Sequence, residues 1–577
     1  MSGDASDGSL AMEQIDSRRL TGPNLVSPGP AAILDAACPD EHADALVAAW
    51  RERVTDLLSA LGWSDVRTHV RRWPGGVSLA FSAPIDGLYA ATELGEWAFE
   101  SAVGHLSGEG PKGREAALER ARSAFAEEAN PALLALEAEA RRRDVAFLWD
   151  DDEVSVGMGS GSATWSARDV PAPDQVDWAG IHDVPTVLVT GTNGKTTVVR
   201  LAAAMAEAAG RVTGSTTTEG IKIGDAWVER DDYSGPGGAR TLLRDRRVEV
   251  AVLETARGGL LRRGVAFTRA DGAVITNVAE DHLGEYGVHD LDALVQAKLT
   301  AGLARRPGAP LGLNADDAGL AAAHDRLAGP LSWFTMRPDT DLVASHLRAG
   351  GDVVAVVADS IKRSRSGRLV DVVPVAEVPI TLGGAAAHNV ANALAAVVAG
   401  SALGLPHSAI AEGLRSVRGG ARDNPGRGNL YDAAGARVLV DFVHNAHGYA
   451  ALGAMVAGLA PKRLLLVLGH AGDRGNEAIR ELARAAWGLS PTRVLVKELR
   501  SYLRGRPEGE IPAVIVDELL RLGAAPEAID RVADEPEAAR AALAWAEPGD
   551  LVILPAHEDR AGVEAVLRDA GARPLQP

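Results

Sequence analysis

The sequence predicts an α/β protein of three domains, in which a small α+β N-terminal domain precedes two successive α/β domains. The chain has 577 residues, and at about 150 residues per domain this length predicts three or four domains. From residue 186 onwards, short apolar runs alternate with helix-like stretches, which is typical of a parallel sheet covered by helices. A stretch rich in Gly, Ser and Pro separates these runs from the segment before them.

The part of the chain before these runs is predicted to contain a tail, one small domain and a linker. Residues 1–16 are polar and are expected to form a disordered tail. Residues 17–156 make up the predicted α+β domain, within which residues 112–143 are rich in Ala and have helical apolar spacing. Residues 157–183 have the composition of a linker.

Two sets of apolar runs are predicted to be the strands of the later domains. In the central domain, residues 184–424, they are residues 186–190, 248–253, 273–276 and 310–313. In the C-terminal domain, residues 425–577, they are residues 436–442, 463–468, 493–497 and 551–555. Because helical segments separate consecutive runs, a parallel sheet is expected in each domain. The smaller C-terminal domain is therefore predicted to be Rossmann-like.

The composition excludes several classes of protein. The chain carries 59 Lys and Arg against 78 Asp and Glu, a net charge of -19, and 46% of its residues are hydrophobic. These values are typical of a globular protein and exclude collagen-like, wholly disordered and coiled-coil structures. The acidic balance argues against nucleic acid or a membrane surface as a partner. The single cysteine, Cys38, excludes a disulfide framework and a multi-Cys zinc site.

Neither a secretory signal nor a membrane span is expected. The N-terminus MSGDASDGSLAMEQ lacks the basic and apolar regions of a signal peptide, so a cytoplasmic location is expected. The longest weakly polar stretch, residues 385–405, is interrupted by His388, Asn389 and Asn392. These polar residues favour a buried amphipathic helix over a membrane span.

A phosphate-binding loop is predicted directly after the first strand of the central domain. The loop consists of Gly191, Thr192, Asn193, Gly194, Lys195, Thr196 and Thr197, and a helical segment follows it. In such a P-loop the backbone N–H groups face the anion, Lys195 contacts the β- and γ-phosphates, and Thr196 offers its hydroxyl to Mg²⁺. The match is to a shortened pattern, because Val189 stands where the full pattern has Gly. The alternative is a tight turn with a solvated Lys.

Candidate metal ligands follow the neighbouring strands. Glu254 ends one strand, and the next strand leads into Asp281 and His282. The carboxyl ends of parallel strands share one edge of a sheet, so these side chains are expected beside the phosphate loop, where carboxylate and imidazole suit a divalent cation. Glu254 alone is equally consistent with a salt bridge at a strand end. Lys298 lies on a helix predicted at residues 291–303 and, taken alone, is expected to be a solvated residue.

These motifs together resemble the Mur ligase family of ATP-dependent enzymes that join an amine to a carboxylate. They occur in the family's order: GTNGKTT from residue 191, Glu254, TNVAEDHL from 276, NADD from 314, HNVANALAA from 388, PGR from 425 and DFVHNAHG from 441. The resemblance is strongest to the Mur-type half of the cyanophycin synthetases, through GSTTTEGI, YSGPGGAR, LETARGGLLRRG, GDRGNE and YLRGRPEGE. The N-terminal region is also similar to theirs, but the ATP-grasp core of those enzymes is absent between it and the phosphate loop.

The resemblance implies roles for residues that match the family's motifs. Lys195 and Thr196 would hold phosphates and Mg²⁺, Glu254 would be a metal ligand, and His282 would contact a second metal. Lys298 lies where Mur ligases often carry a carbamylated lysine, which would turn a cation into an anion able to bind or position metal.

Three further implied roles concern the nucleotide. Asn389 would approach the adenine, Arg427 would reach the phosphates from the C-terminal domain, and Asp441 would reach the ribose. His444 and Asn445 lie in the same loop as Asp441 and would orient nucleotide or substrate. The family's Asp-Tyr-Ala-His-Asn-Pro reads DFVHNA here, so a hydroxyl and a stiffening Pro are missing from this loop.

The predicted function is therefore ATP-dependent amide or isopeptide ligation through an acyl phosphate, with ATP and Mg²⁺ as cofactors. By resemblance the amine is Arg-like and the carboxylate Asp-like, so the partner is an amino acid or a short peptide or polymer. A non-catalytic nucleotide-binding scaffold, a regulatory subunit and a P-loop small-molecule kinase stay open as alternatives. So does assembly into a homo-oligomer.

Overall fold

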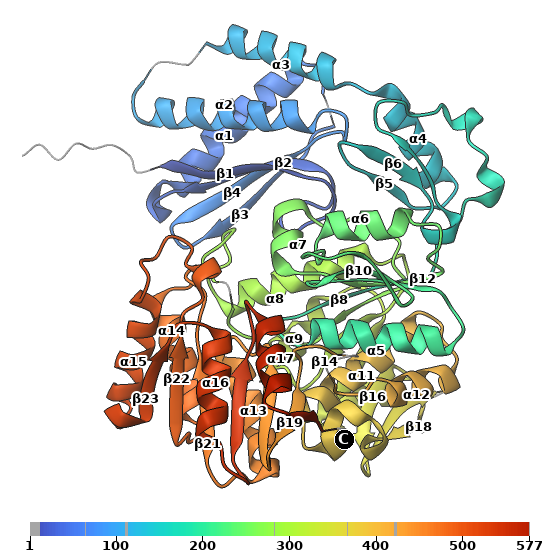
Figure 1. Ribbon diagram of the computed structural model, residues 1–577. Helices are drawn as coiled ribbons and strands as arrows, with labels where there is room; N and C mark the ends of the chain where they lie inside the picture. Colours follow the sequence, from blue (N-terminus) through green and yellow to red (C-terminus); the bar gives the residue numbers. More distant parts are fainter. Residues whose placement is uncertain are drawn as a thin grey trace, which may run out of the picture.

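The computed structural model describes residues 12–63, 65–109, 113–281, 283–365, 367–420 and 424–575. Their strands form sheets of four, three, eleven and seven strands. In Figure 1 the N-terminal part, in blue, lies above the central part, in green and yellow, and the C-terminal part, in red, lies beside the central one. The α/β fold that the sequence predicts is confirmed.

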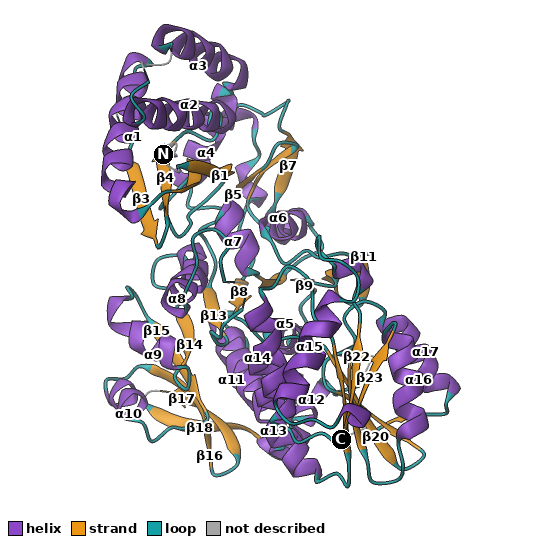
Figure 2. Ribbon diagram, turned by 90° about the vertical axis from the view of Figure 1, so that its left-hand side faces the viewer, coloured by secondary structure: helices purple, strands orange, loops and turns teal. Residues whose placement is uncertain are grey.

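The N-terminal sheet is antiparallel, with the order β1-β2-β4-β3. Its elements are β1 (Glu13–Leu20), β2 (Ala31–Ala37), α1 (Asp40–Ala60), β3 (Thr68–Trp73), β4 (Gly76–Ser82), α2 (Leu88–Leu106) and α3 (Arg114–Glu128). One face of the sheet packs its apolar side chains, such as Leu34 and Phe81, against these helices. The opposite face is directed towards α7 (Arg257–Arg263) and the central part of the chain (Figure 2).

A three-stranded sheet follows, and it includes part of the predicted linker. It consists of β5 (Phe147–Trp149), β6 (Glu153–Val156) and β7 (Ala163–Ser166), with α4 (Pro131–Arg142) packed against it. The structure therefore differs from the prediction for residues 157–183, because β7 pairs with β6 and Val176 is buried in the same apolar cluster. The predicted tail is also too long, since β1 begins at Glu13 and pairs with β2.

The central sheet has the order β11-β10-β9-β12-β8-β13-β14-β15-β16-β17-β18. Its strands are β8 (Thr186–Thr190), β9 (Thr213–Thr217), β10 (Gly220–Ile223), β11 (Ala226–Glu229), β12 (Val250–Glu254), β13 (Gly272–Ile275), β14 (Leu311–Asn314), β15 (Leu331–Thr335), β16 (Asp352–Val357), β17 (Ser360–Arg365) and β18 (Arg368–Pro374). In the sheet order, the run β9-β12-β8-β13-β14-β15-β16 pairs in parallel. Antiparallel strands extend the sheet at both ends.

Helices cover both faces of this sheet. One face carries α5 (Lys195–Ala208), α11 (Ala387–Ala402) and α12 (His407–Ser416). The other carries α6 (Pro236–Arg244), α7, α8 (Leu291–Leu299), α9 (Ala318–Ala323) and α10 (Asp341–Arg348). The helix expected within residues 385–405 is therefore α11, buried against the sheet. No helix in the described part of the chain is both long and apolar enough to cross a bilayer.

The C-terminal sheet has the order β23-β22-β21-β24-β20-β19-β25. Its strands are β19 (Asn429–Ala433), β20 (Ala436–Asp441), β21 (Leu464–Leu468), β22 (Arg493–Lys497), β23 (Ile529–Val532), β24 (Leu551–Pro555) and β25 (Arg573–Pro574). One face packs against α13 (Ala446–Leu459), α14 (Asn476–Trp487) and α15 (Glu510–Arg521), and the other against α16 (Glu535–Trp545) and α17 (Arg560–Asp569). All eight predicted strands are present, with ends that differ from the prediction by at most two residues.

Candidate active site

The phosphate loop lies at the carboxyl edge of the central sheet, between β8 and α5. Strands β12 and β13 flank β8, so the residues that end these strands lie on either side of the loop. Glu254 is the last residue of β12, and Thr276 directly follows β13. This strand order brings the predicted loop and the predicted carboxylate together.

Two glycines shape the loop because no larger residue fits. Gly191 has φ of +149°, and a Cβ there would lie 1.8 Å from Oγ1 of Thr276. Gly194 has φ of +86°, and its Cβ would lie 2.1 Å from Oδ1 of Asn392 on α11. The backbone is thus pressed against its neighbours at both ends of the turn, directly before the N-terminus of α5. Such a cradle of backbone N–H groups at a helix N-terminus suits an anion.

The end of β13 holds the loop in place. The backbone N–H of Asn193 donates to Oδ1 of Asn277 at 3.0 Å, and Nδ2 of Asn277 donates back to the carbonyl of Asn193 at 3.0 Å. Oγ1 of Thr276 donates to the same carbonyl at 2.6 Å. The sequence motif TN is therefore a support for the loop.

Thr196 and Glu254, two of the predicted metal ligands, contact each other. Oγ1 of Thr196 donates to Oε2 of Glu254 at 2.8 Å, and both residues are buried, at 4% and 2% exposed. A hydroxyl and a carboxylate are oxygen ligands of the kind that Mg²⁺ prefers, so this pair fits the ion. Lys195 lies beside it, with Nζ donating to the carbonyls of Gly191 and Thr192 at 3.2 and 3.0 Å.

Lys298 is buried, which contradicts the expectation of a solvated side chain. It lies near the end of α8 with only 3% of its surface exposed. Burial lowers the pKa of Lys298 well below its ordinary value, and the charge of Lys195 adds to this effect, while Asp281 opposes it. A lower pKa favours the neutral amine, the form of a lysine that can react as a nucleophile.

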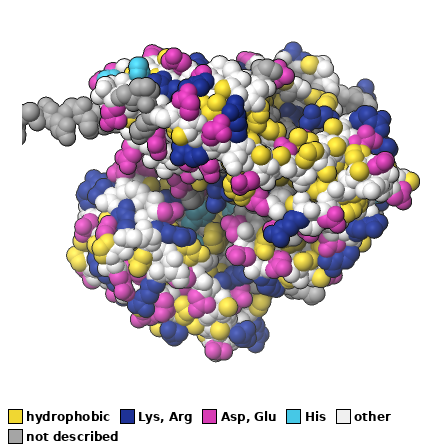
Figure 3. All heavy atoms as spheres, turned by 90° about the horizontal axis from the view of Figure 1, so that it is seen from above, with side chains coloured by type: hydrophobic (Ala, Val, Ile, Leu, Met, Phe, Trp, Pro, Cys, Tyr) yellow, Lys and Arg dark blue, Asp and Glu magenta, His cyan; other side chains and the backbone are white. Residues whose placement is uncertain are grey.

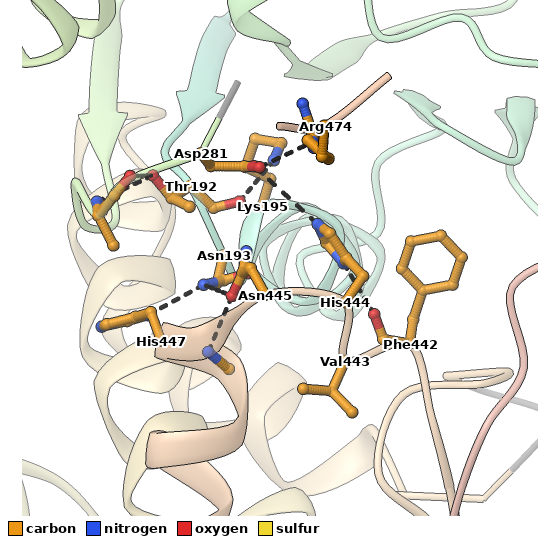
Figure 4. A network of polar contacts seen from close by, with 12 residues as sticks. Thr192, Asn193, Lys195, Asp281, Phe442, Val443, His444, Asn445, His447 and Arg474 are labelled. Atoms are coloured by element: carbon orange, nitrogen blue, oxygen red, sulfur yellow. Dashed lines mark hydrogen bonds and ion pairs between the residues drawn. The ribbon is translucent and has the colours of Figure 1, made fainter. Parts of the chain in front are cut away.

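The C-terminal part of the chain contacts the phosphate loop directly. Figure 4 shows Asn445 and His447 pointing towards Asn193. The two asparagine side chains exchange hydrogen bonds of 3.3 and 3.2 Å, and Nδ2 of Asn193 lies 2.9 Å from Nδ1 of His447. Asn445 also caps α13 by accepting from the N–H of Gly448. The loop after β20 is therefore fixed to the loop after β8.

Two side chains of the C-terminal part, those of Arg474 and His444, approach Asp281 (Figure 4). Its carboxylate lies 3.0 Å from Nη2 of Arg474 and 4.0 Å from Nε2 of His444. Burial lowers the pKa of His444, and the nearby carboxylate of Asp281 opposes this shift. Arg474 belongs to the GDRGNE motif, but the sequence pattern predicts no role for this residue or for His447.

A buried ion pair anchors the last loop of this region. Nζ of Lys497 contacts Oε1 of Glu535 at 2.5 Å, with side chains 0% and 1% exposed. The same carboxylate accepts from the backbone N–H groups of His557, Glu558 and Asp559. Nε2 of His557 lies 2.9 Å from the carbonyl oxygen of Val443, so this loop supports the one that carries His444.

A cavity of about 420 Å³ adjoins the phosphate loop. Asn389, Arg427 and Asp441 line it together with residues of the loop. Nδ2 of Asn389 donates to the carbonyl of Ile380 at 3.0 Å, and the Arg427 guanidinium lies 4.3 Å from the ring centre of Phe442. Burial raises the pKa of Asp441, opposed by the charges of His388 and Arg427. The volume falls in the range of small-ligand sites.

The structure thus brings most of the predicted residues to one place. Thr197 is buried at the start of α5, next to the other residues of the phosphate loop. Around the loop and its cavity lie Glu254, Lys298, Asn389, Arg427 and Asp441. His282 lies outside the described residues.

Two family domains match the chain. Residues 189–400 match the Mur ligase middle domain, and residues 426–556 match the Mur ligase glutamate ligase domain. The UDP-N-acetylmuramoyl-L-alanyl-D-glutamate--2,6-diaminopimelate ligase of Geobacter metallireducens is 30% identical over 65% of this chain and 74% of that protein. The chain belongs to the Mur ligase family.

Another relative is matched over only part of its length. Cyanophycin synthetase of Trichormus variabilis is 39% identical over 64% of the chain, but the match covers only 41% of that protein. The chain therefore spans less than half of the length of that relative. Among solved structures, E. coli FolC in complex with DHPP and ADP has a TM-score of 0.49 at 20% identity, over 67% of this chain and 89% of that one.

Proposed function

We propose that the protein is an ATP-dependent amide ligase that joins an amino acid amine to a carboxylate through an acyl phosphate. The observation that carries this proposal is the buried Thr196–Glu254 pair beside the phosphate loop, with the buried side chain of Lys298 on α8. A simple anion site needs the loop and Lys195. A buried carboxylate there is unfavourable for phosphate binding unless a cation lies between the two.

The reaction proceeds in two steps. A carboxylate oxygen of the acceptor attacks the γ-phosphorus, the bond to the β-phosphate oxygen breaks, and ADP leaves. The amine nitrogen then attacks the acyl carbon, the phosphate leaves, and the amine loses a proton. Lys195 and Arg427 offset the charge of the two anionic reactants, and the phosphate loop holds them in line.

The metal and nucleotide roles complete the proposal. Bound Mg²⁺ would neutralise phosphate charge, held by Thr196 and Glu254, with His282 and a carbamylated Lys298 contacting or positioning metal. Asn389 would contact the adenine and Asp441 the ribose. Support comes from their place around one cavity. The contacts of Asn445 and His447 with Asn193 hold the C-terminal part against the phosphate loop. Closure of this kind would limit the hydrolysis of an acyl phosphate.

For the substrates we propose an Arg-like amine and an Asp-like carboxylate, presented by an amino acid or a short peptide or polymer. The support is the 39% identity to a cyanophycin synthetase over the Mur-type region, together with a net charge of -19 that favours a cationic reactant. On the face seen in Figure 3, basic and acidic side chains are interspersed among the described residues. That pattern does not suit a nucleic-acid partner.

The test measures ADP release with ATP, an Arg-like amine and acidic amino acids or short acidic peptides. We expect release that requires both amine and carboxylate, and an amide product in the mass spectrum. The K195M variant is expected to lose turnover, while K462M, which removes an exposed lysine from the C-terminal part, serves as the matched control. Full turnover without amine would overturn the proposal, and a stable phosphorylated product would identify a kinase.

A further inference from the structure

Residues 283–290 connect two parts of the proposed active site. Asp281 precedes this segment in the chain, and Asp290 ends it. The side chain of Asp290 caps α8, accepting from the N–H of Ala293 at 2.7 Å, and α8 carries Lys298. This short loop therefore lies in the chain between Asp281 and the helix that carries Lys298.

The loop contains a tight and strained turn. The N–H of Gly284 donates to the carbonyl of Val288 at 2.8 Å, and the N–H of Val288 donates to the carbonyl of Glu285 at 3.0 Å. At its tip Tyr286 has φ of +52°, a conformation that bulky residues rarely adopt. Strain of this kind persists where surrounding contacts over-determine the backbone.

Those contacts come from the N-terminal sheet. The Arg18 guanidinium of β1 lies 4.7 Å from the ring centre of Tyr286, and Nη1 of Arg71 on β3 donates to the carbonyl of Tyr286 at 3.4 Å. Trp73 packs against the next residue so closely that a Cβ on Gly287 would lie 2.5 Å from its ring. The ring of Trp73 also stacks on His289 at 6.3 Å.

Arg18 is itself held rigidly. It is 8% exposed, and its Nη1 lies 2.6 Å from Oδ2 of Asp35, which is 2% exposed and also accepts from Ser78. Nε of Arg18 donates to the carbonyl of Leu261 on α7 at 3.4 Å. Buried charges are costly unless they are well paired, so this fixed guanidinium forms a firm support for the ring of Tyr286.

The opposite side of the loop reaches the active site. Glu285 forms an ion pair with Arg257 of α7, which is 8% exposed. Burial lowers the pKa of Arg257, and the charges of Glu285 and Asp281 oppose this shift. Asp281 in turn pairs with Arg474 from the C-terminal part. The N-terminal and central parts thus contact this loop, and the C-terminal part contacts Asp281 just before it.

We infer that the N-terminal sheet is a clamp on residues 283–290 that positions Asp281 and α8 for the reaction. The inference rests on the ligase function proposed above and deepens it. Arg18, Arg71 and Trp73 are positioning residues, since none of them lines the nucleotide cavity. The N-terminal domain then takes part in catalysis through the loop, whether or not it also holds the acceptor.

Hydrogen–deuterium exchange of the full chain tests the clamp in the R71A variant, with R72A as the matched control. Arg72 is the next residue on β3, but its side chain is paired with Asp44 at the surface. We expect the amides of Gly284 and Val288 to exchange about tenfold faster in R71A than in R72A, because local opening becomes easier. The kcat for amine-dependent ADP release should fall about tenfold while the KM for ATP changes less than about twofold.

A second variant keeps the test decisive if R71A folds poorly. Y286L removes the ring from the loop side and leaves the N-terminal sheet unaltered, so it should reproduce the faster exchange. Equal exchange in R71A, Y286L and R72A would overturn the inference. A wild type without amine-dependent ADP release would refute the ligase proposal instead, and the exchange data would still decide the clamp.

Discussion

Replacing Arg474 by alanine removes the charged contact that the C-terminal part makes with Asp281. The two side chains are 3.0 Å apart and only 11% and 15% exposed. Two unit charges at this distance attract by about 5 kcal/mol at an effective permittivity of about 20. Desolvation and side-chain ordering offset much of this attraction, so a charged hydrogen bond contributes about 1.5–3 kcal/mol net.

This free energy predicts a loss of about 10- to 150-fold in kcat/KM for R474A. The loss arises because the C-terminal part closes less firmly over the phosphate loop and Asp281 loses a cation that fixes it. Steady-state ADP release at saturating ATP, with the amine varied, measures the effect. R474K should fall between R474A and the wild type, since an ammonium restores the charge but not the planar fork of the guanidinium.

R480A is the matched control for this measurement. Arg480 lies on α14 and faces Glu477 at 3.6 Å, with side chains 41% and 62% exposed. Exposed pairs of this kind contribute little, so R480A should stay within about twofold of the wild type. Equal values of kcat/KM for R474A and R480A would refute the role of the ion pair in closure.

Three further substitutions have defined outcomes. G194A places a Cβ at a residue with φ of +86° and against the side chain of Asn392 on α11, so calorimetry should find ATP binding at least about tenfold weaker. G210A is the control, because Gly210 has a similar φ of +75° with open space around it, and this variant should bind ATP normally. K298A should lower kcat about 10- to 100-fold without unfolding the protein, and full activity would remove Lys298 from the mechanism. E535A leaves the ammonium of Lys497 buried without its carboxylate partner. Urea unfolding should then record a loss of about 3–5 kcal/mol in the free energy of unfolding. A loss under about 1 kcal/mol would contradict a stabilising role for the Lys497–Glu535 pair.

The phosphate site was predictable because its parts follow from strand order. Parallel strands end at one edge of a sheet, so a Gly-rich loop after one strand and a carboxylate after another are brought together without any knowledge of packing. Glu254 beside Thr196 is the clearest case. The importance of Gly191 and Gly194 in the turn was also predictable from the sequence, since a turn that leads directly into a helix requires unusual backbone angles.

Other features depend on tertiary contacts that local patterns do not encode. The spacing around Lys298 is the same for a solvated and a buried lysine, and only the docking of α8 decides between them. Residues 157–183 have a linker composition, yet β7 pairs with β6 and Val176 joins a core. The partnership of Asp281 with Arg474 joins distant parts of the chain, and the charges alone do not identify it.

Two of the contacts between the C-terminal part and the central part differ in chemistry. The reciprocal amide pair of Asn193 and Asn445 carries no net charge, and each side chain both donates and accepts. Dissolved ions therefore leave it nearly untouched, whereas they screen the attraction between Asp281 and Arg474 wherever water reaches it. Rising ionic strength should therefore weaken the contact between Asp281 and Arg474 before the contact between Asn193 and Asn445. The C-terminal part should then separate from the central part first at Asp281, while it stays attached at the phosphate loop.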